Sequence, residues 1–266
     1  MSDFQGLQRT TCIALALALL ASASGVFAQE WGSLTGRLVV DGSVGDPAAL
    51  NVNKDTEYCS QHSPTDETVV VGEDDGLTNA FVYLYLKRGK SVDVHPDLES
   101  AAAEPVVLDN KGCRFEPHAL LVQTGQELKI ISSDPIGHNT KLDLIKGVSF
   151  NQSVNSDTPL SKTFDKSEPV PLTASCSIHP WMNCHVLIRD NPYMAITGED
   201  GSFEIKNIPA GEHEFIFWQE AVGNLKNLSL GSAGKTNRKG RAKLKIPAGG
   251  TLELGDVKIP AATLGK

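Results

Sequence analysis

The sequence predicts an all-β protein. After residue 28, no stretch of about 11 to 18 residues shows the spacing of apolar residues that is typical of an amphipathic helix. Short segments rich in β-branched and aromatic residues alternate with glycine- and proline-containing turns, which favours a sandwich or barrel. Phe203 and Ile205, then Phe215 and Phe217, show the two-residue spacing of half-buried strands.

Residues 1–28 have the features of a secretory signal peptide. Arg9 precedes a short apolar run at 13–21, and Val26-Phe27-Ala28 offers small residues for cleavage. The run is shorter than the roughly 20 residues that span a bilayer, although an uncleaved N-terminal anchor is an alternative. We therefore expect an exported, soluble chain, periplasmic or secreted, without a membrane span after cleavage.

The first and last thirds of the remaining chain are expected to contain short strands. In the first, we predict strands at 34–40, 68–71 and 80–86, a loop at 43–66 and a single helical turn at 100–104. In the last, the pattern predicts strands at 202–205, 213–218, 243–246 and 251–259.

The middle third is expected to be built in the same way. Strands are predicted at 106–108, 119–122, 127–131 and 185–189, with an extended segment at 169–175. Residues 147–168 are rich in Ser, Asn, Asp and Lys and predict a long loop.

One short segment suggests a metal site. Cys176, His179 and Met182 fall within seven residues, and His138 lies upstream beside Asn139. A thiolate, two imidazoles and a thioether form the soft-to-borderline ligand set that suits copper. We predict one mononuclear copper ion, Cu(I)/Cu(II), bound by a tight loop and by His138 from a neighbouring strand.

These residues resemble the cupredoxin (blue-copper) family. Residues 176–182 are similar to the amicyanin pattern Cys-x-x-His-Pro-aromatic-Met, and three upstream segments match the order F-x-P, V-x-x-G and H-N: 115–117, 122–125 and 138–139. The resemblance, which extends to plastocyanin, implies a Greek-key β-sandwich over 104–190. It further implies His138, Cys176 and His179 as strong equatorial ligands, Met182 as the weak axial ligand, and Asn139 as a brace for the loop.

Cys184 and His185, directly after the loop, are not part of that pattern and allow three alternatives. Zinc could be bound by Cys176, His179, Cys184 and His185. Haem could attach at Cys184-His185, although the usual motif is Cys-x-x-Cys-His. A Cys176–Cys184 disulfide would leave no metal site. His118, at the start of a strand, is expected to be exposed or to neighbour a ligand.

Four cysteines follow the signal, at positions 59, 113, 176 and 184. In an oxidising compartment they would form two disulfides, with three possible pairings. If Cys176 binds metal, Cys59 and Cys113 are the preferred pair because both lie outside the ligand loop.

The flanking regions resemble carboxypeptidase-regulatory-like repeats, which form a small transthyretin-like β-sandwich. The resemblance rests on 35–39, 79–84 and 196–211, in that order. It predicts a discontinuous sandwich of 29–90 and 191–262 into which the cupredoxin-like domain of 104–190 is inserted. Three consecutive β units are the alternative.

The formal net charge of −8 argues against nucleic acid and is compatible with a basic protein partner. No nucleophilic triad, paired catalytic carboxylates or phosphate loop is evident, so we expect no enzyme.

The resemblance implies a type 1 copper protein that transfers single electrons between redox partners, for example a c-type cytochrome or a dehydrogenase. Electrons would pass through the edge of His179, next to an apolar patch of Pro180 and Trp181. The alternatives are a non-redox binding or structural sandwich, with a carbohydrate or envelope partner, and a copper carrier.

Overall fold

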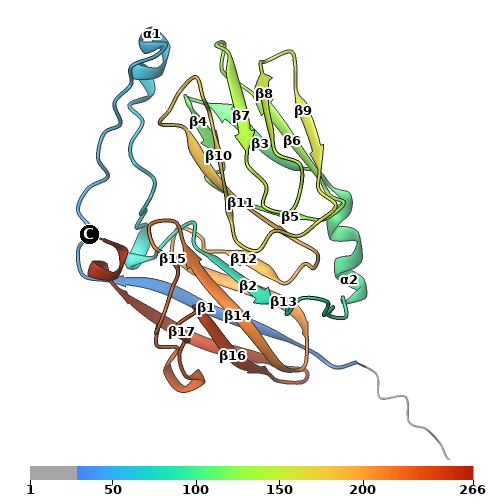
Figure 1. The fold of residues 1–266 in the computed structure, drawn as a ribbon. Coiled ribbons are helices and arrows are strands. Elements are labelled where there is room, and N and C mark those ends of the chain that lie inside the picture. The colour runs from blue at the N-terminus through green and yellow to red at the C-terminus, as the bar shows by residue number, and fades with distance from the viewer. Residues whose placement is uncertain (1–28, 266) are drawn as a thin grey trace, which may run out of the picture.

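The computed structural model describes residues 29–265, so the predicted signal peptide lies outside the described residues. The predicted all-β class is confirmed: four sheets form two stacked sandwiches (Figure 1). No helix in the range 29–265 is long and apolar enough to cross a membrane. The helices are one-turn segments: α1 (Thr56–Cys59), η1 (Ser60–His62), η2 (Glu73–Asp75), α2 (Pro96–Glu99), η3 (Ser100–Ala103), η4 (Gly231–Ala233) and η5 (Ala261–Leu264).

The lower body in Figure 1, which we call the flanking sandwich, contains strands from both ends of the chain. One sheet has the order β13 (Ser202–Pro209), β1 (Trp31–Asp41), β17 (Thr251–Pro260). The other has the order β12 (Met194–Ile196), β2 (Phe81–Tyr85), β14 (Gly211–Gln219), β15 (Gly223–Asn224), and β16 (Arg241–Ile246) also pairs with β14. Apolar side chains of both sheets, such as Leu34, Val82 and Phe217, form its core.

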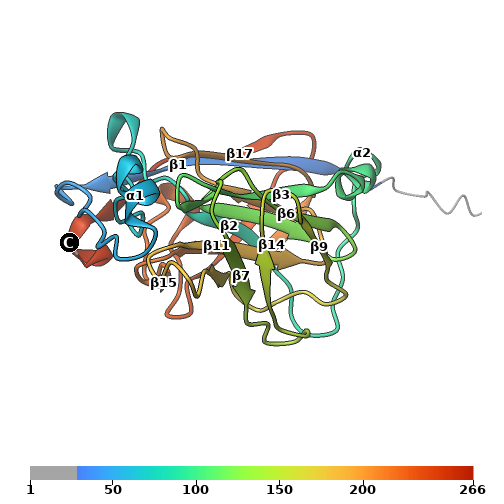
Figure 2. The same cartoon turned by 90° about the horizontal axis from the view of Figure 1, so that it is seen from above.

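Distant segments pair within the flanking sandwich. β1 is antiparallel to β13, with Leu34 opposite Ile205, and it runs parallel beside β17 (Figure 2). β2 is antiparallel to β14, with Val82 opposite Phe217. We propose on this basis that 29–90 and 191–262 form one discontinuous domain and that 104–190 is inserted into it.

The upper body, the central sandwich, contains the middle of the chain. One sheet has the order β5 (Ala119–Gln123), β11 (Asn183–Arg189), β10 (Leu172–Ser175), β7 (His138–Leu142), β8 (Phe150–Val154). The other has the order β4 (Arg114–Glu116), β3 (Val106–Lys111), β6 (Glu127–Ser132), β9 (Leu160–Thr163). Phe115, Leu128 and Ile188 belong to its buried core.

Two predictions of local structure are wrong. Residues 147–168 are not a single loop, because β8 and β9 lie within them. Both are outer strands of their sheets with largely solvent-exposed residues, so their sequences are polar. Conversely, 68–71 forms no strand: Val71 makes only an isolated bridge to Leu77, around a tight turn in which Asp74 and Asp75 have positive φ.

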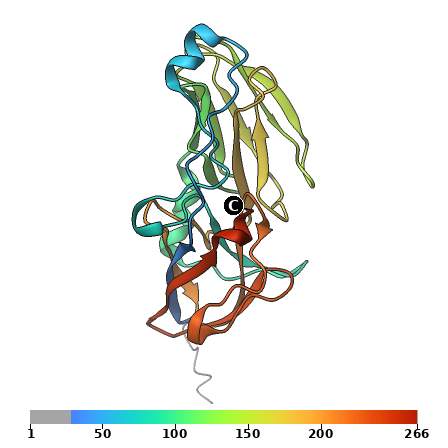
Figure 3. The ribbon, with the colours of Figure 1, turned by 90° about the vertical axis from the view of Figure 1, so that its left-hand side faces the viewer.

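Residues 43–66, which we call the strap, leave the flanking sandwich, run along the central sandwich to its far end and return (Figures 1 and 3). α1 lies at that far end. Cys59, the last residue of α1, forms the preferred disulfide with Cys113 between β3 and β4, with Cα atoms 5.5 Å apart. The disulfide therefore holds the strap against the central sandwich, at the turn between β3 and β4.

A small apolar cluster joins the two bodies. Phe81 and Trp218 of the flanking sandwich pack with Ala119 and Leu187 of the central sandwich. Arg189 on β11 is buried and donates to the carbonyl of Leu84 on β2 at 3.3 Å. The two sandwiches thus share a buried interface.

Candidate metal centre

Three of the four predicted ligands converge at one end of the central sandwich. His138 is the first residue of β7, Cys176 directly follows β10, and His179 lies in the loop between β10 and β11. Because β10 pairs with β7, that loop lies beside the start of β7. One ligand atom of each residue lies within 4.8 Å of the others, and all three side chains are buried.

The loop that carries Cys176 is fixed by hydrogen bonds. The Oδ1 atom of Asn139 accepts from the backbone N–H of Ser177 at 2.8 Å and of Ile178 at 3.2 Å. Cys176 N–H donates to the carbonyl of Met182 at 3.2 Å, which closes the loop. Asn139 therefore braces the loop, as the resemblance implies.

His138 is oriented by a buried carboxylate. Its Nε2 lies 2.9 Å from Oδ2 of Asp134, while its Nδ1 is buried near Cys176 without a well-aligned hydrogen bond. Asp134 also accepts from Gly112 N–H, Cys113 N–H and the Tyr58 hydroxyl. Burial opposes its charge, but the hydrogen bonds from His138 and these partners lower the pKa of Asp134 to about 2.

His179 has a similar partner on the strap. Its Nε2 lies 2.8 Å from Oδ2 of Asp55, and its Nδ1 lies 3.7 Å from Cys176 Sγ. Asp55 is the N-cap of α1 with a φ of 45°, and its side chain makes no cap hydrogen bond. Asp55, and the strap that carries it, thus cover the Nε2 side of the His179 ring.

The edge of His179, through which electrons are expected to pass, therefore lies beneath the strap. His179 is 0% exposed. The neighbouring Trp181 is only partly exposed and donates through Nε1 to the carbonyl of Cys113 at 3.0 Å, whereas Pro180 is exposed. The cover arises because the disulfide holds the strap against this end of the sandwich.

Cys176 and Cys184 are both free and buried, which contradicts a disulfide between them. Burial raises the pKa of Cys176, but contacts with His138, Asn139 and His179 outweigh it and lower the pKa to about 6. Burial raises the pKa of Cys184 far above its usual value. Cys184 lies in the core of the central sandwich, so its thiol is not free for haem attachment.

The four residues of the zinc alternative do not come together in the part of the chain that the structure describes. There, Cys176 groups with His138 and His179, whereas His185 groups with His118 and Glu220. His118 was expected to be exposed or to neighbour a ligand; it is buried, so the first of these two expectations is wrong.

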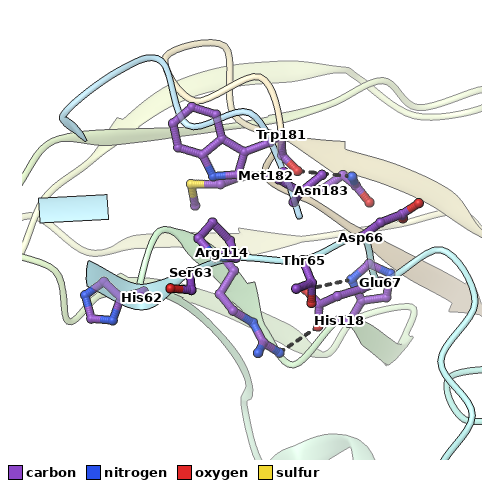
Figure 4. Close-up of a pocket in the computed structure, with 12 residues that line it drawn as sticks. His62, Ser63, Thr65, Asp66, Glu67, Arg114, His118, Trp181, Met182 and Asn183 are labelled. Carbon is purple, nitrogen blue, oxygen red and sulfur yellow. Dashed lines mark hydrogen bonds and ion pairs between the residues drawn. The ribbon is translucent and has the colours of Figure 1, made fainter. Parts of the chain in front are cut away.

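Met182 is buried in the core of the central sandwich, in the loop that carries Cys176. It also lines a small pocket with Trp181, Asn183 and His118 (Figure 4). Its role as an axial ligand stays a prediction.

The donor set suits copper. Each histidine has Nε2 beside a carboxylate, which leaves Nδ1 as the ring nitrogen on the Cys176 side that could bind a metal. Neither carboxylate was predicted from the sequence. Asp134 lies four residues before His138 and could have been noticed, whereas Asp55 lies 124 residues from His179 and no pattern connects them.

No family model and no curated protein match the chain. Structural comparison finds a copper-containing nitrite reductase (NirK) from Thermus scotoductus, at 18% identity over 40% of this chain and 25% of the reductase, with a TM-score of 0.29. It also finds a purple cupredoxin from Nitrosopumilus maritimus, at 18% identity over 31% of this chain and 98% of that chain, with a TM-score of 0.27. The reduced Cu(I) form of an amicyanin mutant matches at 19% identity over 40% of this chain and 97% of amicyanin, with a TM-score of 0.29. The structural neighbours are cupredoxins, and this chain spans about a quarter of the nitrite reductase.

Proposed function

We propose that this protein is an exported type 1 copper protein that carries single electrons between redox partners and catalyses no reaction of its own. The observation that carries the proposal is the buried convergence of Cys176, His138 and His179. Copper, when bound, would supply a one-electron Cu(I)/Cu(II) couple. His138, Cys176 and His179 would be its strong ligands and Met182 the weak axial one.

The surrounding residues would keep the ligands in place in both oxidation states. Asn139 fixes the backbone after Cys176, and Asp134 and Asp55 each fix one imidazole ring. Contacts with Asp134 and Cys176 outweigh burial and raise the pKa of His138 to about 9, so the metal-free histidine carries a proton that copper must displace. Ligands that are already oriented need little rearrangement, which favours rapid electron transfer.

The expected partners are redox proteins such as a c-type cytochrome or a dehydrogenase. Asp55 places an acidic side chain on the covered His179, and Glu57 is exposed two residues later, which favours a basic partner surface. The Cys59–Cys113 disulfide is typical of oxidising compartments and supports export to the periplasm or beyond.

The decisive test is the spectrum of the copper-loaded full chain. An intense visible charge-transfer band is expected, which disappears on reduction and in Cys176→Ser, whereas Cys184→Ser retains it because Cys184 lies outside the ligand group. A colourless copper-loaded protein would exclude the type 1 assignment and favour a non-redox sandwich, with a carbohydrate or envelope partner.

Met182→Leu separates an electron carrier from a copper carrier. Loss of the weak thioether should raise the reduction potential and leave copper retention largely unchanged. Loss of copper retention without a shift in potential would favour the copper carrier.

A further inference from the structure

A second group of potential metal ligands lies where the two sandwiches meet. His118 directly precedes β5, His185 lies on β11, and Glu220 directly follows β14. One ligand atom of each lies within 4.8 Å of the others. Oε2 of Glu220 is 2.6 Å from Nε2 of His118 and 3.3 Å from Nδ1 of His185. The three side chains therefore converge on one point, with both histidines buried.

Each imidazole also has a polar neighbour on its other side. Nδ1 of His118 lies 3.7 Å from Oε2 of Glu67, and Nε2 of His185 lies 3.1 Å from the hydroxyl of Thr173. Metal-binding histidines commonly have a carboxylate or another polar partner on the nitrogen that does not bind metal. Here that arrangement leaves His118 Nε2 and His185 Nδ1 toward Glu220.

We propose that His118 Nε2, His185 Nδ1 and the Glu220 carboxylate bind one divalent transition-metal ion of the zinc or copper(II) type. Two donors about 2.1 Å from a tetrahedral ion lie about 3.4 Å apart. The observed separations of 2.6 and 3.3 Å need to widen by less than about 1 Å, which side-chain rotation supplies. Two imidazoles and a carboxylate, without a thiolate, suit zinc or copper(II).

Three protein ligands leave room for a fourth. His118 lines the pocket of Figure 4, a cavity of about 100 Å³ that Glu67, Arg114 and Met182 also line. A cavity of this size has room for a few water molecules. Of the three proposed ligands only His118 lines this pocket, so the fourth ligand is water or a small molecule that reaches the ion beside the His118 ring, as at zinc sites with an open position.

The test is metal binding by the full chain carrying Cys176→Ser, which removes the thiolate of the first site. The metal-free protein is titrated with zinc chloride by calorimetry, and with copper(II) chloride followed by electron paramagnetic resonance. We expect the protein to bind one equivalent of either metal. The copper(II) form should show nitrogen hyperfine coupling in the paramagnetic resonance spectrum and no blue colour. Adding Glu220→Gln should weaken this binding at least tenfold, and adding His185→Gln should have a similar effect.

His138→Gln in the same Cys176→Ser background is the matched control, because it removes a histidine of the first site only. Binding that is lost in His138→Gln and retained in Glu220→Gln would overturn the proposal, as would the absence of any bound zinc or copper in the Cys176→Ser protein. Circular dichroism of each variant establishes that it is folded. If the Glu220 variant fails to fold, nitrogen hyperfine coupling from two histidines in Cys176→Ser/His138→Gln still supports the proposal, and its absence refutes it.

Discussion

At the scale of single residues, the two free cysteines differ in their surroundings although both are buried. Cys176 Sγ lies near the His179 ring and receives the backbone N–H of His179 at 3.4 Å, and these contacts stabilise a thiolate. Cys184 lies among apolar side chains, and nearby Glu220 and Glu67 add negative charge that disfavours its thiolate. The fold thus favours the thiolate form of Cys176 and the protonated thiol of Cys184.

This difference predicts a single thiolate titration. In the metal-free protein, ultraviolet absorbance of thiolate should rise with a midpoint near pH 6, the value to which the pKa of Cys176 is lowered. Cys176→Ser should abolish the transition, and Cys184→Ser should retain it. A transition that depends on Cys184 would contradict this account.

Asp134 links the pH dependence of stability to the site. Its pKa is lowered from 3.8 to about 2 in the folded chain. A lowered folded pKa stabilises the fold above the unfolded pKa, so this contribution is complete above about pH 4 and is lost as the pH falls through 2. The size is about 2 kcal/mol.

We therefore expect metal-free Asp134→Asn to be less stable than the wild type by about 2 kcal/mol at pH 7. The difference should shrink as the pH falls from 4 toward 2, as measured by urea unfolding. A difference that is constant across this range would mean that the carboxylate charge is unimportant.

At the scale of elements, the strap shields His179 of the candidate metal centre from solvent. Residues 43–66 bring Asp55 to His179, and the Cys59–Cys113 disulfide anchors them there. Asp55→Ala should uncover the His179 ring. Oxidation of the copper(I) protein by ferricyanide, followed by stopped flow, should accelerate several-fold.

Glu57→Ala is the control for this experiment, because it removes the same charge from α1 and leaves the His179 contact in place. Equal acceleration in both variants would assign the effect to charge and would argue against a cover.

The features that could be predicted from the sequence are those whose residue types are explained by nearby residues in the chain. The ligand loop was recognisable because Cys176, His179 and Met182 lie close together and serve one chemistry. β8 and β9 were missed because outer strands with exposed residues have no apolar alternation. The contact between Asp55 and His179 depends on a disulfide and a long detour of the chain, which leave no pattern.

At the scale of the whole molecule, the buried interface predicts one cooperative unfolding transition. Leu187 and Ile188 are neighbours on β11, but Leu187 packs in the interface cluster and Ile188 in the core of the central sandwich. Leu187→Ala should cost about 2 to 5 kcal/mol and separate the calorimetric transition into two.

Ile188→Ala should lower stability by a similar amount and leave the transition single, because it weakens one body and not its contact with the other. Two transitions in the wild type would show that the sandwiches are energetically independent.

The pairing of β1 has a consequence for synthesis. Arg37 on β1 bonds to Asp256 on β17, 219 residues later in the chain. A ribosome therefore makes β1 and β2 long before their partners, and residues 104–190 can complete a sandwich while β1 is still unpaired. An unpaired apolar strand can pair with other chains. Nascent chains truncated after residue 190 should therefore fold their central part and aggregate through β1, and this strand is where a chaperone would be needed.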